Sequence, residues 1–205
     1  MNMRTASALA SLCLTAPFAP AAIVGVTGMT TWLGSPPVSC TSGTLLGMNA
    51  YTWDEQQGIT LSGIACDMVN NPGNSGAPVP GVISGLFDSH FIHYQDFTGV
   101  PGPTGTITFN GPIIGVIFRP LNLDNSDVPC GALGTTYPTG YPFRGLATTP
   151  VSFVTINSNV LTFDLKTMQP NNYVDQVRVI TATPTPGSAA LLGLAGLAFV
   201  RRRAR

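Results

Sequence analysis

The sequence has few charged residues and little helix-forming material. Asp, Glu, Lys and Arg make up 9% of the 205 residues, against roughly a quarter in an ordinary globular domain. Glutamate and lysine, which favour helices, occur once each, whereas glycine occurs 23 times and proline 18 times. This composition favours short extended segments joined by turns.

The middle of the chain also lacks a basic patch. Residues 22–183 contain four basic and nine acidic side chains, a net charge of −5. Phosphate binding needs clustered lysine and arginine, so this balance excludes nucleic acid as a partner. The other five basic residues lie at the two ends of the chain: Arg4, Arg201, Arg202, Arg203 and Arg205.

The amino end has the pattern of an export signal. Arg4 supplies a positive start, residues 6–16 are small and moderately apolar, and Ala19-Pro20-Ala21 fits the Ala-x-Ala cleavage pattern. We therefore predict a signal peptide over residues 1–21, removed by signal peptidase. Export places the mature chain in an oxidising compartment, where three cysteines remain: Cys40, Cys66 and Cys130. One disulfide is expected, with Cys40 and Cys66 as the favoured pair.

Short apolar or β-branched segments alternate with turn residues through the body. Strands are predicted at 44–50, 58–68, 89–95, 105–109, 113–118, 151–156, 159–165 and 173–180. The segments on either side of Asn157-Ser158-Asn159 predict a hairpin, and Gly111-Pro112 is expected to join residues 106–109 with residues 113–118 in the same way. The pattern as a whole predicts an all-β fold, a single antiparallel β-sandwich of jelly-roll type over residues 22–181.

Both histidines lie in one predicted strand. His90 and His93 are three residues apart, and on a strand that spacing points them to opposite faces. His90 would share a face with Ile92 and Tyr94, and His93 with Phe91. We therefore expect hydrogen-bonded histidines in place of a shared zinc site, and no Cys-x-x-Cys spacing offers a thiolate one.

Two loops resemble known functional loops in part. Gly73-Asn-Ser75-Gly76 resembles the nucleophile loop of trypsin-fold serine proteases, but no histidine precedes Ser75 to act as its base, so a polar turn is the preferred interpretation. Residues 122–127 carry the oxygen-bearing side chains of Asp124, Asn125 and Asp127. They are candidate calcium ligands, although Asx turns explain the same residues.

Aromatic and paired acidic residues leave two further interpretations open. Trp32 and Trp53 are candidate contacts for a sugar ring, which would make the body a carbohydrate-binding module. Asp54 and Glu55 are the one adjacent acid pair, but neighbours on a strand point to opposite faces, and no second carboxylate is identifiable by spacing. A secreted hydrolase is therefore only a third hypothesis.

The last residues form three consecutive elements. Pro184-Thr185-Pro186 comes first, residues 189–200 carry no polar side chain, and Arg201, Arg202, Arg203 and Arg205 end the chain. The apolar run would be about 18 Å long as a helix, against a hydrocarbon core of about 30 Å. Uncharged residues from 179 onward could lengthen it to a transmembrane helix. The arginines would then act as a cytoplasmic stop.

This tail resembles the PEP-CTERM sorting signal of bacterial exosortase substrates. The resemblance covers residues 182–205 and implies recognition by a membrane-embedded, exosortase-like sorting protease. It also implies a body left outside the cell, commonly with extracellular polysaccharide. Thr185 stands where the family has glutamate, so this chain carries a Pro-Thr-Pro variant of the motif. Residues 89–93 and 175–180 also resemble strands of uncharacterised bodies in such proteins.

Together these patterns predict an exported protein of the cell surface or extracellular matrix. Its body would be structural or would bind a ligand, with no catalytic activity and no required cofactor. The tail would hold it in the inner membrane, transiently or stably.

Overall fold

A computed structural model describes residues 22–96, 102–148, 151–166 and 173–183. These residues belong to one compact unit, Pro20–Pro184. The predicted signal peptide, the sorting motif, the apolar run and the terminal arginines lie outside the described residues. No helix within the described ranges has the length and hydropathy for a membrane crossing.

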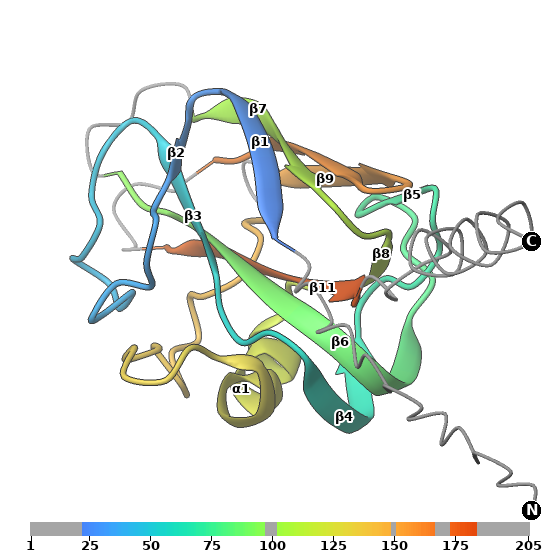
Figure 1. Cartoon of the computed structure of the whole chain (residues 1–205). Helices are drawn as coiled ribbons and strands as arrows, with labels where there is room; N and C mark the ends of the chain where they lie inside the picture. The colour runs from blue at the N-terminus through green and yellow to red at the C-terminus, as the bar shows by residue number, and fades with distance from the viewer. Residues whose placement is uncertain (1–21, 97–101, 149–150, 167–172, 184–205) are drawn as a thin grey trace, which may run out of the picture. The chain divides into compact units, whose positions relative to one another are not determined.

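The described chain is mostly β, with two sheets packed together and one short helix (Figure 1). One sheet, called sheet A, has the strand order β1-β7-β10-β9-β5; the other, sheet B, has the order β2-β3-β6-β11-β8, with β4 also paired to β6. Sheet A consists of β1 (Ile23–Gly28), β5 (Gly73–Asn74), β7 (Thr104–Phe109), β9 (Phe153–Asn157) and β10 (Val160–Asp164). Sheet B consists of β2 (Thr30–Trp32), β3 (Ala50–Asp54), β4 (Ile59–Cys66), β6 (Gly81–Tyr94), β8 (Ile113–Ile117) and β11 (Asp175–Ala182).

The predicted sandwich is thus confirmed, with three corrections. β2 and β3 pair in parallel, so the strands are not all antiparallel. Gly111 and Pro112 do not close a hairpin, because they lead from β7 in sheet A to β8 in sheet B. Residues 122–127, expected as a loop, lie inside the helix α1 (Pro120–Cys130).

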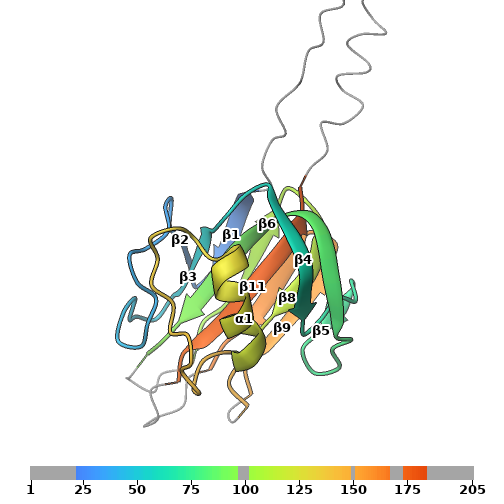
Figure 2. The ribbon, with the colours of Figure 1, turned by 90° about the horizontal axis from the view of Figure 1, so that it is seen from below.

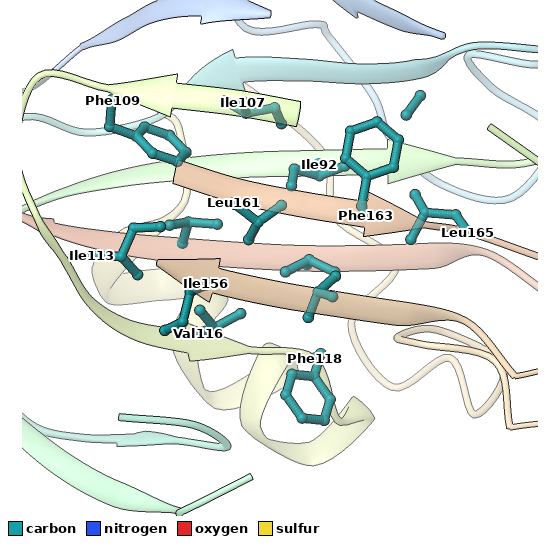
Figure 3. Packing of buried hydrophobic residues seen from close by; sticks show 14 of the residues in the cluster. Ile92, Ile107, Phe109, Ile113, Val116, Phe118, Ile156, Leu161, Phe163 and Leu165 are labelled. Atoms are coloured by element: carbon teal, nitrogen blue, oxygen red, sulfur yellow. The ribbon is translucent and has the colours of Figure 1, made fainter. Parts of the chain in front are cut away.

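The hairpin at residues 157–159 is confirmed. β9 and β10 pair antiparallel with Val160 opposite Asn157, and Ser158 takes the left-handed conformation at φ 56°. Inward and outward residues alternate along both strands, because sheet A packs on the core with one face and meets solvent with the other. Figure 3 shows the core between the sheets, where Phe109, Leu161 and Phe163 of sheet A pack near Ile92 and Val116 of sheet B.

The centre of sheet B, around β11 and the second half of β6, is covered on both faces. Its second face carries a separate apolar cluster that includes Trp53, Phe91, Ile180 and Leu123 of α1. Figure 2 shows α1 lying across β11 and β8 on this side. Seven of the eight residues of β11 are therefore buried, charged ones included.

Candidate binding cavity at the sandwich edge

The two tryptophans have different environments. Trp32, at the end of β2, is 45% exposed, whereas Trp53 is fully buried and packs on Phe91 with ring centroids 5.1 Å apart. The prediction that Trp53 contacts a sugar is therefore wrong. It assumed a strand with one solvent face, but β3 pairs with the part of β6 that is covered on both sides.

The predicted calcium ligands lie on α1 and face an arginine. Arg144 Nη1 donates to Asp124 at 2.7 Å and to Asp127 at 2.6 Å, while Asn125 is exposed. Arginine thus already neutralises the carboxylates that a cation would need. Within the described ranges, no group of three or more His, Cys, Asp or Glu side chains could hold a metal ion.

The predicted disulfide is absent. Cys40, Cys66 and Cys130 are buried free thiols, so the favoured pairing of Cys40 with Cys66 is not formed. Burial raises the pKa of Cys66 and of Cys130 to about 12. Both thiols therefore stay protonated, and unreactive as nucleophiles, at neutral pH.

The histidines point to opposite faces of β6, as expected. His90 Nδ1 lies 2.7 Å from Asp54 Oδ1, and its ring packs on Phe109 between the sheets. His93 lies 3.2 Å from the carbonyl oxygen of Thr44 and 3.2 Å from Gln176. Each imidazole is held by its own neighbours.

A buried arginine, which the sequence did not single out, links the helix to sheet B. Arg178 of β11 forms a two-point ion pair with Glu55 at 2.7 and 2.9 Å, and also reaches Asp127 at 3.2 Å and Ser126. Its guanidinium lies 4.9 Å from the Phe91 ring centroid. Asp54 and Glu55 are thus bonded to His90 and Arg178 respectively, in separate structural contacts.

The surface of the body is almost free of exposed charge. All nine acidic residues lie in the described ranges, and all but Asp164 have buried or half-buried side chains. Arg144 and Arg178 are buried, and Lys166 is half-buried beside Asp164. Among the described residues, Arg119 has the most exposed charged side chain, with 61% accessible, followed by Asp164 with 47%.

A cavity of about 360 Å³ opens beside Arg119, a volume typical of small-molecule sites. Four separate segments line it: residues 75–76 after β5, residues 118–120 at the start of α1, residues 146–148, and residues 151–153 at the start of β9. The lining residues are Ser75, Gly76, Phe118, Arg119, Pro120, Leu146, Ala147, Thr148, Val151, Ser152 and Phe153.

Asp175 holds two of these segments in place from beneath. Its carboxylate accepts hydrogen bonds from the Ala147 amide at 2.7 Å, the Ser152 hydroxyl at 2.5 Å and the Lys166 amide at 2.9 Å. Burial raises the pKa of Asp175 to about 7, although these three donors oppose the shift. The cavity wall therefore rests on a buried, hydrogen-bonded carboxyl group.

Comparison with protein families, with curated proteins and with solved structures found no match. The sequence did not predict the cavity, because its segments come from distant parts of the chain and are brought together only by the sheet topology. One signal pointed to it: the Ser75-Gly76 loop, singled out for its likeness to a protease loop, forms part of the wall.

Proposed function

We propose that this chain is an exported protein of the cell surface or extracellular matrix, sorted by its carboxyl-terminal tail. The order of Pro184-Thr185-Pro186, the apolar run 189–200 and the terminal arginines carries the proposal. The export signal at residues 1–21 supports it independently. The partners would be signal peptidase, an exosortase-like protease and the bacterial membrane.

The body would act as a single jelly-roll-like domain with a structural or binding role. Its acidic side chains support this proposal, because most of them are buried or half-buried and many are bonded to arginine, histidine or backbone amides. Asp54 and Glu55 in particular stabilise the fold through basic partners. We therefore propose that neither is a catalytic carboxylate.

A carbohydrate-binding module is the second candidate. The exposed Trp32 and the edge cavity favour it, because aromatic and apolar surfaces pack against the C–H faces of sugars.

Intact-mass measurement of the protein recovered from its native cell surface tests the sorting proposal. The expected species lacks residues 1–21 and the terminal arginines. Replacing Pro184 and Pro186 together by alanine should prevent the carboxyl-terminal cleavage, whereas Pro170→Ala, outside the tail, should leave it unchanged. A surface species that retains Arg201 to Arg205 in the unaltered chain would contradict the proposal.

A further inference from the structure

Arg119 has no short ion pair within the described residues. Its Nε lies 3.8 Å from Asp67 Oδ1, whereas the other described basic side chains contact carboxylates at 2.5 to 2.7 Å. Asp67 already accepts the amides of Phe118 and Arg119 at 2.7 Å and the Asn122 side chain at 2.6 Å. The guanidinium of Arg119 is therefore available to a ligand.

The cavity beside it has an apolar wall. Phe153 is 37% exposed and Val151 is 64% exposed, although both are large apolar side chains. The Phe153 ring lies against the backbone of Gly76, where an added Cβ would approach its Cε2 to 3.1 Å. The absence of a side chain at Gly76 thus sets the position of this ring.

Hydroxyl groups complete the lining. Ser75 Oγ accepts the Val154 amide at 3.0 Å, so its O–H can still donate. Thr148 is exposed at the same cavity. The cavity thus offers a cation, an exposed aromatic ring and the hydroxyl groups of Ser75 and Thr148. A sugar ring that carries a carboxylate would use all three kinds of group, whereas an alkyl carboxylate would leave the hydroxyls without a partner.

We propose that the edge cavity binds a uronic acid residue of an acidic glycan. The carboxylate would accept hydrogen bonds from the Arg119 guanidinium, a geometry that arginine favours. One face of the sugar ring would pack on Phe153, and a ring hydroxyl would pair with Ser75. The inference rests on the proposed function in one respect: export would bring the protein into contact with extracellular acidic glycans.

Calorimetric titration of the full-length chain, purified in mild detergent, tests the site. Short oligogalacturonides are the probe, and neutral galacto-oligosaccharides are the matched control. The oligogalacturonides should bind more tightly. Arg119→Gln should weaken their binding about 10- to 100-fold, the range for a hydrogen-bonded charged contact. Lys166→Gln removes a cation outside the cavity lining and should leave the affinity unchanged.

Phe153→Ala should weaken binding of both probes, because the ring packs on the sugar whatever its charge. Phe143→Ala is its control, since Phe143 is 38% exposed and lies outside the cavity lining. Arg119→Lys keeps the charge without the two-point geometry and should give an intermediate affinity. Thermal unfolding of each variant verifies that it is folded.

Any of these results in the titration would overturn the proposal: no binding of oligogalacturonides at millimolar concentration, equal affinity in Arg119→Gln, or tighter binding of the neutral probe. Binding of decanoate in place of the sugars would assign the cavity to alkyl carboxylates and also reject it. Failure of sorting, read from the intact mass, would leave this titration unaffected, so the two proposals fail separately.

Discussion

His93 and Asp175 are both fully buried, and burial changes their pKa values in opposite directions. The pKa of His93 falls from 6.5 to about 4, because desolvation disfavours the imidazolium. The pKa of Asp175 rises from 3.8 to about 7, because desolvation disfavours the carboxylate. In each case the fold favours the neutral form.

The two groups therefore have opposing effects on the pH dependence of stability. Between about pH 4 and 6.5, His93 binds a proton only in the unfolded chain, so its contribution makes the folded state more stable as pH rises. Between about pH 4 and 7, Asp175 binds a proton only in the folded chain, so its contribution makes the folded state less stable as pH rises. The two slopes nearly cancel.

Single variants should separate the two contributions. His93→Gln can still donate to Thr44 and accept from Gln176, and its free energy of unfolding should fall as pH rises from 4 to 7. Asp175→Asn should show the reverse, a rise from pH 4 to 6.5. Urea unfolding across this pH range measures both. A His93→Gln profile parallel to that of the unaltered protein would refute the assignment.

At the scale of elements, α1 depends on tertiary contacts for its position. Its sequence holds two asparagines, a serine and an internal Pro129, all unfavourable within a helix. Asp67 accepts the amides of Phe118 and Arg119 at its start, and Arg178 bonds the carbonyl of Leu123. The helix is thus fixed by charged groups on sheet B and its adjoining loop.

Breaking the Arg178–Glu55 pair should strongly destabilise the protein. Arg178→Met leaves Glu55 buried without its cation, and removing one partner of a buried pair costs about 3–5 kcal/mol. Arg119→Gln, at an exposed site, should change the unfolding free energy by less than about 0.5 kcal/mol. Chemical denaturation compares them, and an equally small loss in Arg178→Met would contradict this role.

The sequence predicted most reliably the strands that have one buried and one solvent-exposed face. β9 and β10 were predictable because one face of sheet A meets solvent, which leaves an alternation in the residues. The strands β1, β2 and β5, most of β3 and the first half of β6 were missed, and α1 was expected to be a loop. The strand predicted at 44–50 is a strand only at Ala50. The position of α1 depends on Asp67, which lies 52 residues before Arg119 in the chain, and on Arg178, which lies 55 residues after Leu123. A local sequence pattern cannot show contacts between residues so far apart.

At the scale of the molecule, the body is one unit whose centre is completed late in the chain. β11 comes last among the strands of the described residues, yet it lies between β6 and β8 and pairs with both. It also supplies Val177 and Val179 to the core between the sheets and Arg178 and Ile180 to the side facing α1. The paired strands of the body therefore extend to Ala182.

Two truncations should therefore behave differently. A chain that ends after Thr183 keeps all described elements and should unfold cooperatively, with a midpoint within a few degrees of the full-length value. A chain that ends after residue 174 loses β11 and should show no cooperative transition. Circular dichroism on heating measures both, and a cooperative transition in the shorter chain would be inconsistent with the central role of β11.

The place of β11 also sets how the body would carry a mechanical load. A force on the residues after Ala182 would enter the body through β11, a central strand. It would have to shear the ladders with β6 and β8 at the same time, because both run alongside β11. An edge strand under load could separate from its neighbour one hydrogen bond at a time. The hydrogen bonds of β11 to both neighbours would instead bear the load together.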